Sequence, residues 1–561
     1  MRQSYPRRTI ALLAATAAAA GLASGCSGAD QVPSIGYAVD TTVTSYNGGT
    51  TAGSASAQAV FGRVLTGFFY TGPDGQPVAD SDTGTAKEVP GEAQTIQYRL
   101  NPKGVYSDGV PTSCDDLVFT WAARSGRVPG FDSASTAGYE DIERVECQPG
   151  SKDGTVVFRP GRRYMPWRTL FGAGELMPAH IAAQAANVPD VVTAVQQDDR
   201  DALGRLAEFW NKGWDLAPGD LDATRFPASG PYRIESFDAD DGLVLVANER
   251  WWGEAPATGR IVVYPKPADL ADKIESGSVA VADIGAGSLP DLDLSAYAVQ
   301  QLPSRGVEQL VLGTRGVFEQ AAARRALALC VPRQALFDEL GRVTEAPEAG
   351  LGSGMSNSRT VQQDSLFYPA VTGAAGQYAG SDVPGAKAAL AETGQKTLTV
   401  RVGYLAPDAR RARTVSMIAD ACRGAGITVQ DASTPDFTPA QLAGGAVDAV
   451  LGGPGGAPGP AGSLDGREDI GGLRSGSGLN IGQFRNGRYD AITDQLAGDD
   501  DSTDQLNLLT EAENLLWAQL PSVPLFATPR TIAFGGGLEH AIPGPSRAGS
   551  GWNMDQWVLQ R

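Results

Sequence analysis

The sequence is poor in the residues and motifs that build common catalytic and metal centres. Only two histidines, His180 and His540, occur in 561 residues, which leaves little room for a histidine-based triad or a zinc site. The chain has no C-x-x-C pair, no G-x-S-x-G motif and no phosphate-binding G-K-[ST] loop. We therefore expect a protein that is not an enzyme, with no catalytic residues, no metal site and no cofactor. Carboxylate-based hydrolysis is the enzymatic alternative that these absences leave open.

Positive charge and long apolar runs are also scarce. The 45 lysines and arginines are outnumbered by 64 aspartates and glutamates, which gives a formal net charge of -19. Nucleic-acid binding needs basic side chains on phosphates, so this balance argues against such a partner. The apolar run at 10–23 is too short to span a bilayer comfortably, and no later run of 18 apolar residues follows it.

The N-terminus has the pattern of a bacterial secretion signal. Three arginines precede the short apolar run, and small residues stand just before Cys26. Residues 22–25 resemble the lipobox of bacterial lipoproteins, although the usual leucine stands one place further from the cysteine than is commonest. We expect a signal peptide at 1–25, lipidation of Cys26, and a small polar tether at 26–33 that holds the protein at the membrane. The alternative is an ordinary secretory signal with an incidental cysteine.

Four cysteines remain when Cys26 is set aside: Cys114, Cys147, Cys330 and Cys422. An even number of cysteines outside the cytoplasm predicts two disulfides.

A pair of carboxylates follows Ser113. Ser113 with Asp116 three residues later predicts a variant capping box at the start of a helix. Asp115 and Asp116 suit the positive end of that helix. A metal-binding pair is the minor alternative, because no other ligand cluster is visible.

The rest of the chain alternates strands and helices, as is typical of an α/β protein. Alternating or short apolar runs predict strands at 34–44, 93–101, 155–159, 233–237, 243–247, 260–264, 278–283, 308–312, 398–404, 427–430, 446–451 and from 524 onward. Helical spacing predicts helices at 55–67, from 113, over most of 182–210, and at 268–274, 318–340 with a break near Pro332, 386–393, 410–424 and 506–520.

Two stretches leave their role open. Trp251 and Trp252 follow the hairpin at 233–247, and either pack in the core or lie near a ligand cleft. The glycine- and proline-rich stretch 452–460 is either a flexible linker or a rim that faces a ligand. His180 and His540 both stand beside prolines or turns, where a structural role is expected.

Several stretches together resemble one family. They are YSDGVP at 106–111, DDLVFT at 115–120, SGPY at 229–232, NERWWGEAP at 248–256, ARRALAL at 323–329 with PR at 332–333, NIGQFRNGRYD at 480–490 and LPSVPL at 520–525. In this order, over nearly the whole mature chain, they resemble the family 5 extracellular solute-binding proteins of ABC transporters, the dipeptide-, oligopeptide- and nickel-binding group.

The resemblance implies an α/β fold of the two-lobed, class II periplasmic-binding-protein type. Two strands join the lobes, and an extra domain is inserted in the first. Mapping onto the family places the first lobe at 34–52, 181–305 and 528–561, the inserted domain at 53–180 and the second lobe at 306–527. Because each disulfide would then lie within one lobe, we expect the pairs Cys114–Cys147 and Cys330–Cys422.

The resemblance also suggests where a ligand binds. In the peptide-binding members an acidic residue after a second-lobe strand receives the ligand's α-amine, but here glycines and a proline occupy that place. This difference argues against ordinary recognition of a free amine, although backbone hydrogen bonds remain possible there. The candidate ligand-binding residues are Tyr46, Asn47, Tyr232, Trp251, Arg315, Gly452 and Gly453. Arg315 suits a ligand carboxylate, with a surface salt bridge as the alternative.

The resulting expectation is a monomeric lipoprotein on the extracytoplasmic face of the cell membrane. It would capture peptides or similar small solutes between its lobes and deliver them to the permease subunits of an ABC importer. The alternative keeps the fold and drops transport, as in actinobacterial lipoproteins of the LpqW type, which regulate cell-envelope glycolipid synthesis.

Overall fold

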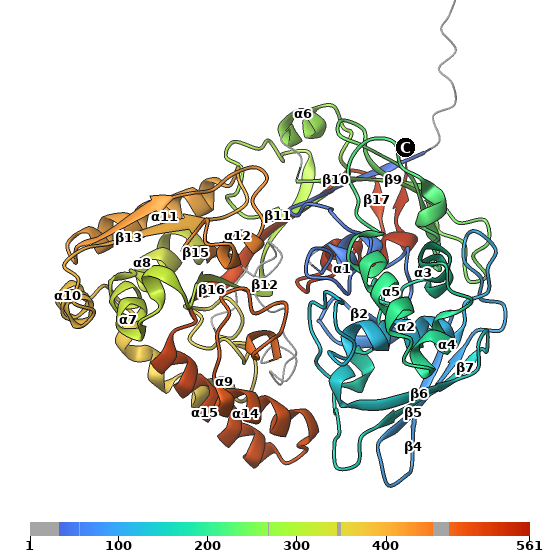
Figure 1. Ribbon diagram of the computed structural model, residues 1–561. Helices are drawn as coiled ribbons and strands as arrows, with labels where there is room; N and C mark the ends of the chain where they lie inside the picture. The colour runs from blue at the N-terminus through green and yellow to red at the C-terminus, as the bar shows by residue number, and fades with distance from the viewer. Residues whose placement is uncertain (1–32, 55, 267–268, 345–348, 453–470, 561) are drawn as a thin grey trace, which may run out of the picture. The chain divides into compact units, whose positions relative to one another are not determined.

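The computed structural model describes residues 33–54, 56–266, 269–344, 349–452 and 471–560 (Figure 1). The predicted signal peptide, Cys26 and Gly453 lie outside these residues. Residues 33–561 form one compact unit.

A ten-stranded mixed sheet runs through this unit. Its strands, in spatial order, are β14 (Ile427–Asp431), β13 (Leu398–Gly403), β15 (Ala449–Leu451), β12 (Tyr297–Leu312), β16 (Ser522–Gly535), β11 (Val281–Gly285), β1 (Ile35–Val39), β10 (Arg260–Pro265), β9 (Gly242–Ala247) and β8 (Tyr232–Asp238).

Strands β12 and β16 join the two halves of this sheet. They are long and antiparallel; β16 pairs with β11 at one end, and β12 pairs with β15 at the other. The ladder is interrupted between Pro303 and Val307, near the middle of the pair. The chain therefore has the predicted two-lobed α/β fold, with two strands as the connection between lobes.

The first lobe packs short helices against β1, β8, β9 and β10. The helices of the first half of the chain are α1 (Ala57–Phe61), α2 (Cys114–Arg124), α3 (Ala179–Ala186), α4 (Val191–Gln196), α5 (Arg200–Lys212) and α6 (Leu270–Glu275). The hairpin of β8 and β9 is the one predicted, with Ile234 and Leu245 buried in the main core beside Trp210. Near the C-terminus, β17 (Leu538–Glu539) pairs with β18 (Val558–Leu559).

A separate four-stranded antiparallel sheet has its own core. Its strands, in spatial order, are β4 (Gly84–Val89), β5 (Thr95–Leu100), β7 (Asp153–Phe158) and β6 (Ile142–Cys147), and a hairpin of β2 (Phe69–Thr71) and β3 (Pro77–Ala79) precedes them in the chain. Helix α2 packs on this sheet through Leu117, and its first residue, Cys114, forms a disulfide with Cys147. These elements fall within 53–180, the range predicted for an inserted domain; the boundaries themselves stay a prediction.

The second lobe is α/β with helices on both sides of β13, β14 and β15 (Figure 1). Its helices are α7 (Ala321–Cys330), α8 (Arg333–Leu336), α9 (Tyr368–Val371), α10 (Val383–Glu392), α11 (Ala409–Arg423), α12 (Ala440–Ala443), α14 (Gly487–Gly498) and α15 (Ser502–Gln519). Cys330 at the end of α7 forms a disulfide with Cys422 in α11. Both disulfides are the pairs expected from the sequence.

One buried arginine organises the second lobe. The guanidinium of Arg333 donates to the carbonyl oxygens of Pro524 at 2.7 Å and Tyr378 at 3.3 Å, and to the backbone of Ser356. It lies 5.1 Å from the ring centre of Trp517. Burial lowers the pKa of Arg333 to about 9. The PR motif at 332–333 thus ties three distant segments together.

Local signals in the sequence explain several elements and miss others. Helix α2 begins with the predicted capping box, in which the side chains of Ser113 and Asp116 bond reciprocally to the backbone. The helix predicted at 55–67 is only five residues long, because a turn follows Phe61. The helix predicted at 318–340 breaks at Pro332, as expected, and ends in a single π-helical turn at Phe337–Gly341.

Candidate ligand-binding site

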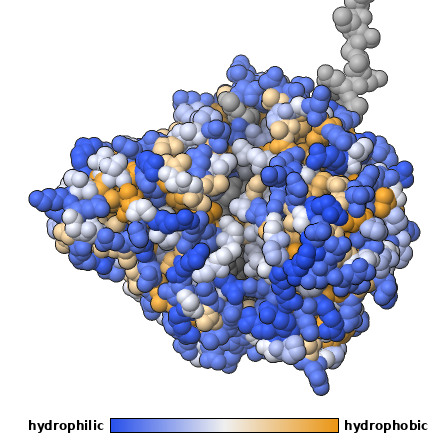
Figure 2. Space-filling model, viewed as in Figure 1, coloured by the Kyte–Doolittle hydropathy of each residue, from blue (hydrophilic) through white to orange (hydrophobic). Residues whose placement is uncertain are grey.

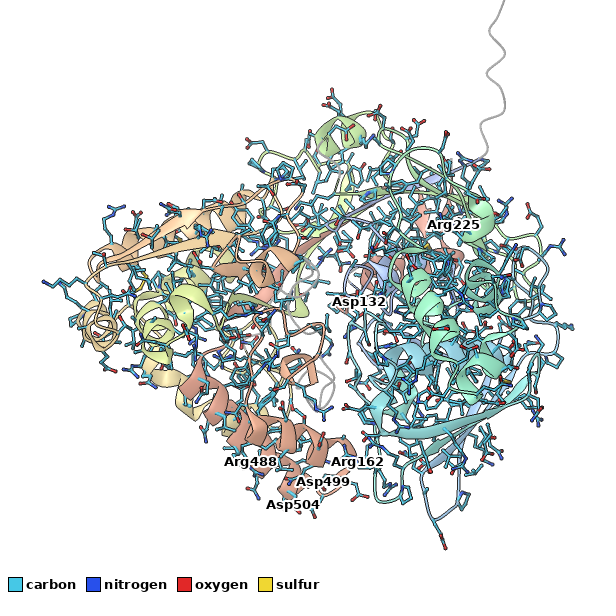
Figure 3. All side chains as sticks on the ribbon, viewed as in Figure 1. Asp132, Arg162, Arg225, Arg488, Asp499 and Asp504 are labelled. Carbon is cyan, nitrogen blue, oxygen red and sulfur yellow. A yellow bond between two sulfur atoms is a disulfide. The ribbon has the colours of Figure 1, made fainter. Side chains whose placement is uncertain are left out.

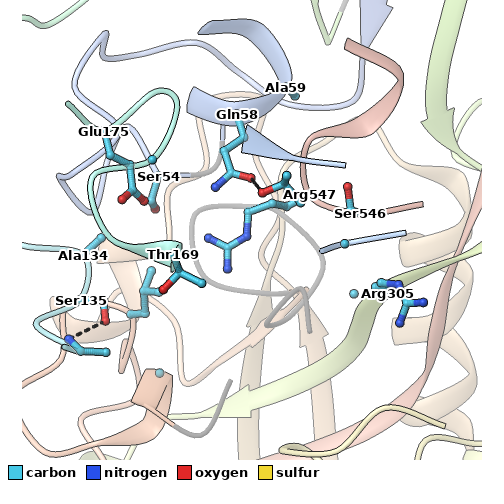
Figure 4. Close-up of a pocket in the computed structure, with 18 of the residues that line it drawn as sticks. Ser54, Gln58, Ala59, Ala134, Ser135, Thr169, Glu175, Arg305, Ser546 and Arg547 are labelled. Carbon is cyan, nitrogen blue, oxygen red and sulfur yellow. Dashed lines mark hydrogen bonds between the residues drawn. The ribbon is translucent and has the colours of Figure 1, made fainter. Parts of the chain in front are cut away.

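A cavity of about 260 Å³ lies between the two lobes. Figure 2 shows the largely hydrophilic face of the molecule hollowed between its halves. The lining comes from widely separated parts of the chain, among them 37–41, 58–59, 69–71, 134–139, 168–175, 304–311, 479–482, 521–522 and 545–549, with single residues such as Asp283, Arg359 and Arg530 between them (Figure 4). Both lobes and the strands that join them therefore contribute to one site.

Two ion pairs form the wall near the connecting strands. Nζ of Lys266 lies 2.7 Å from Oδ1 of Asp40. Nε of Arg530 donates to Asp283 at 2.7 Å, and the other oxygen of Asp283 accepts from the backbone of Ser550 at 2.8 Å. Burial alone would raise the pKa of Asp40, but Lys266 and Arg530 outweigh it and hold that pKa below its ordinary value. The carboxylates of Asp40 and Asp283 are therefore both paired with basic side chains of the protein.

A third ion pair forms the wall on the four-stranded sheet's side. Arg124 pairs with Glu175, and its guanidinium also lies 4.5 Å from the ring centre of Tyr139. The hydroxyl of Tyr139 accepts a hydrogen bond from the backbone of Phe171 at 2.7 Å. Burial raises the pKa of Tyr139 to about 12, so its phenol is neutral at physiological pH.

Two further buried arginines line the cavity, Arg359 in the second lobe and Arg305 in connecting strand β12. Arg359 pairs with Glu513, and both side chains are almost fully buried. Nη2 of Arg305 lies 3.1 Å from Asp364. The Nε and Nη1 atoms of Arg305 have no hydrogen-bond partner among the described residues. Arg305 stands at the interruption between β12 and β16, so a polar side chain with spare donors lies at the connection between lobes.

The lobes also touch at the side of the cavity opposite the connecting strands. Backbone N–H groups donate across this boundary from Leu479 to Ala134 at 2.9 Å and from Met165 to Ala497 at 2.8 Å. Nη2 of Arg162 lies 3.3 Å from Asp494 across the same boundary. An open, charged groove marks this edge, lined by Arg162, Arg163, Arg488, Asp494, Asp499, Asp504 and Glu511 among others (Figure 3).

Three of the predicted ligand-binding residues are buried in the first lobe instead. The hydroxyl of Tyr46 donates to the carbonyl of Pro227 at 3.0 Å, and that of Tyr232 to the carbonyl of Thr258 at 2.7 Å. The side-chain amide of Asn47 donates to Trp210 and accepts from Gly49. All three are inaccessible to solvent and none lines the cavity. Their polar atoms serve the backbone of the lobe, so the structure gives them a structural role.

The remaining predicted residues do not meet at the cavity either. The ring centres of Trp251 and Trp252 lie 4.5 Å apart, and Trp252 donates to the carbonyl of Asp82 at 2.6 Å. Both side chains are half-buried, and neither is among the described lining residues of the cavity. Arg315 is exposed and lies outside the lining. Gly452 has φ of +124° and donates its N–H to the carbonyl of Gln309 at 2.9 Å, which supports the strand edge beside a lining residue.

Groups that sequence patterns associate with chemistry have structural roles here. His180 lies 2.9 Å from the carboxylate of Asp108, outside the lining, and the carbonyl of His540 accepts from Asn553 in a turn. Cys114, Asp115 and Cys147 come close enough to hold a metal ion, but the two sulfurs are bonded to each other. The carboxylate of Asp115 accepts from the backbone of Gly150 at 2.8 Å.

Sequence reasoning missed most of the lining. Asn480 lines the cavity and belongs to the stretch 480–490, which carries part of the family resemblance. That stretch could therefore have identified a lining residue from the sequence. Arg547 and Arg305 belong to no such stretch, and no local pattern marks them. Within the described residues, no helix is long and apolar enough to cross a membrane.

Comparison with known proteins agrees with this architecture. The family model described as "Bacterial extracellular solute-binding proteins, family 5 Middle" matches residues 81–464. "Uncharacterized lipoprotein Rv2585c" of Mycobacterium tuberculosis is 42% identical over 98% of this chain and 97% of its own length. "Probable monoacyl phosphatidylinositol tetramannoside-binding protein LpqW" of the same species is 27% identical over 50% of this chain and 38% of its own.

Solved structures share the fold at low identity. A periplasmic EDTA-binding protein, EppA, has a TM-score of 0.74 at 21% identity, over 94% of this chain and 97% of that one. The oligopeptide-binding protein AppA of Bacillus subtilis, in complex with a nonapeptide, has a TM-score of 0.72 at 14% identity, over 94% of this chain and 99% of that one.

Proposed function

Because the chain belongs to the family 5 bacterial extracellular solute-binding proteins, we propose that it captures a peptide or similar small solute in the cavity between its lobes for an ABC importer. It acts as a monomer, is held by a lipid on Cys26 at the extracytoplasmic face of the membrane, and hands its solute to permease subunits. It performs no catalysis.

The cavity is the observation that carries this proposal. It is lined from both lobes and from the strands that join them, so a bound solute contacts every part that moves when the lobes separate. A solute that binds only the closed arrangement selects it in proportion to its differential affinity for that state. The extracellular character of the family and the lipoprotein names of the relatives support a place at the outer face of the membrane.

A regulatory role is the second candidate, and one observation favours it. Among the described lining residues, each carboxylate is already paired with a cation of the protein, so none is free to receive a peptide's α-amine. Under this candidate the protein keeps the binding fold and acts in cell-envelope glycolipid synthesis, as proposed from its similarity to LpqW.

Uptake measurements in a deletion strain separate the two candidates. The first predicts that loss of the gene abolishes uptake of a labelled solute found in the purified protein, and that a plasmid copy restores it. Unchanged uptake together with an altered glycolipid profile would overturn transport in favour of regulation. A Cys26→Ser variant, unable to carry the lipid, should appear in the culture medium and restore neither phenotype fully.

A further inference from the structure

We propose that the solute carries an anionic group, most simply a carboxylate, and that Arg547 binds this group inside the cavity. This inference rests on the proposed function and specifies the chemical class of its ligand.

The cavity is cationic although the chain is strongly acidic. The described residues of the lining include six arginines and three carboxylates, an excess of three positive charges among them, in a chain whose formal net charge is -19. The lining arginines are Arg124, Arg168, Arg305, Arg359, Arg530 and Arg547, and the carboxylates are Asp40, Glu175 and Asp283. An apolar-walled cleft with one sign of charge raises the local concentration of solutes of the opposite sign.

Ion pairing leaves two of these arginines without a carboxylate. Arg124, Arg305, Arg359 and Arg530 each pair with an acidic side chain of the protein. Arg168 and Arg547 have no ion pair with any described residue; the guanidinium of Arg168 lies 4.5 Å from the ring centre of its neighbour Trp167. Arg547 has neither an ion pair nor a stacking partner among the described residues.

Arg547 extends from a backbone that is fixed on both sides. The carbonyl of Pro545 accepts from the backbone N–H of Arg305 at 2.8 Å, and the hydroxyl of Ser546 donates to the carbonyl of Gly72 at 3.2 Å. Figure 4 shows the side chain of Arg547 reaching into the cavity near Gln58 and Thr169. An anchored backbone with a guanidinium that has no partner in the described part of the chain offers two parallel donors to a carboxylate, the geometry that arginine uses for bidentate recognition.

The neighbouring polar groups suit the same anion. Arg305 keeps its Nε and Nη1 donors unused among the described residues while nine-tenths of its side chain is buried. The backbone of Arg305 is bonded to the segment that carries Arg547, and both arginines line the cavity. A ligand cation, by contrast, would meet no free carboxylate among the described lining residues.

Pooled ligands of defined charge test this proposal by thermal shift. One tripeptide library is prepared in three forms, with free termini, with an amidated C-terminus and with an acetylated N-terminus. Pools of organic acids, phosphate monoesters and neutral sugars are measured beside them. We expect the free and acetylated tripeptides, or the organic acids, to raise the melting temperature, and the amidated library and the sugars to leave it unchanged. A shift with phosphate monoesters alone would assign the anion as phosphate instead of carboxylate.

Variants then identify the residue that binds the anionic group of the ligand. By calorimetric titration with the best member of the active pool, Arg547→Gln should raise Kd at least tenfold, Arg547→Lys less, and Arg168→Gln only a few-fold. Arg423→Ala, at an exposed arginine on α11, should leave Kd unchanged. A pool that binds equally well to wild type and Arg547→Gln, or amidated and neutral ligands that bind as well as acids, would overturn this inference and leave the proposed function standing. No shift with any pool would overturn both.

Discussion

The backbone N–H of Leu479 in the second lobe donates to the carbonyl oxygen of Ala134 in the first lobe at 2.9 Å. Together with the contact between Met165 and Ala497, this bond joins the lobes at the side of the cavity away from strands β12 and β16. The cavity is thus bounded by a covalent connection on one side and by separable contacts on the other. Opening of the lobes must break the Leu479–Ala134 and Met165–Ala497 hydrogen bonds, while strands β12 and β16 stay intact.

Charge removal at this boundary should make opening easier. Arg474 pairs with Glu140 across the boundary and lies 2.8 Å from Asp494. Because these side chains are partly exposed, we expect Arg474→Ala to cost about 0.5–1 kcal/mol, which speeds hydrogen exchange of the Leu479 amide about two- to fivefold.

Exchange measured by mass spectrometry on a peptide that contains Leu479 checks this expectation. Arg488→Ala is the matched control, because Arg488 pairs at 2.5 Å with Glu511 inside the same lobe. The difference in exchange rate between the two variants should become smaller at high salt, since salt screens exposed ion pairs. Identical exchange in both variants would show that the Arg474 pairs do not hold the boundary.

The carboxylate of Glu513 should be essential for the stability of the second lobe. It accepts from the backbone of Arg359 at 2.5 Å and of Thr360 at 2.9 Å, and it is the sole carboxylate paired with the buried Arg359 among the described residues. Glu513→Gln leaves that guanidinium charged and unpaired, which costs about 3–5 kcal/mol. Denaturant unfolding should show this loss, while Glu511→Gln at the surface should change stability by less than about 1 kcal/mol.

Asp116 should make stability fall between mildly acidic and neutral pH. Burial raises the pKa of Asp116 to about 6, against hydrogen bonds from the backbone of Ala179 and Ser113 that oppose the rise. The folded state therefore holds the proton more tightly than the unfolded state. Its stabilising contribution is present below pH about 4 and is lost as pH rises through about 6, with a size of up to about 3 kcal/mol.

Melting temperatures between pH 4 and 7 test this linkage. Asp116→Asn should flatten this part of the profile, because the substituted side chain does not titrate. Asp115→Asn, at the same end of α2, should keep the slope of the wild type. A profile for Asp116→Asn that runs parallel to the wild type would contradict the assignment.

Each disulfide should stabilise its own region. The Cys330–Cys422 bond spans 92 residues of sequence and the Cys114–Cys147 bond spans 33. On the loop-entropy account these correspond to about 4.5 and about 3.5 kcal/mol. Cys330→Ser with Cys422→Ser should expose helix α11 to proteolysis and leave the four-stranded sheet protected; the other double variant should do the reverse. Equal loss of protection throughout would mean that the lobes unfold as one unit.

The sequence predicted the repeating elements well because their patterns are local. Strand β8 places buried side chains between more exposed ones, strand β9 is a short apolar run, and the capping box of α2 needs only Ser113 and Asp116. Strand β12 was predicted only over its last residues, because Pro303 and Gly306 read as turn residues. In the structure they fall at the interruption of the ladder, where a missing N–H and a bend are tolerated.

The candidate site was harder to predict for a physical reason. Family position predicted Tyr46 and Tyr232 as ligand-binding residues, but side-chain direction decides contact, and the hydroxyl of each donates to a distant backbone carbonyl in the first-lobe core. Arg547 and Arg305 come together through a backbone bond between segments far apart in sequence. No pattern of residue spacing along the chain predicts a contact between segments so far apart.

The most direct test of the account is native mass spectrometry of the mature chain, purified gently and then denatured to release what it holds. Gln58 lies in the cavity wall and points inward (Figure 4). We predict a solute of defined mass and anionic character on the wild type, absent from Gln58→Trp and retained by Gln395→Trp, an exposed position outside the cavity. The same solute on both variants, or an empty wild type that stays empty with every anionic pool, would contradict binding in this cavity.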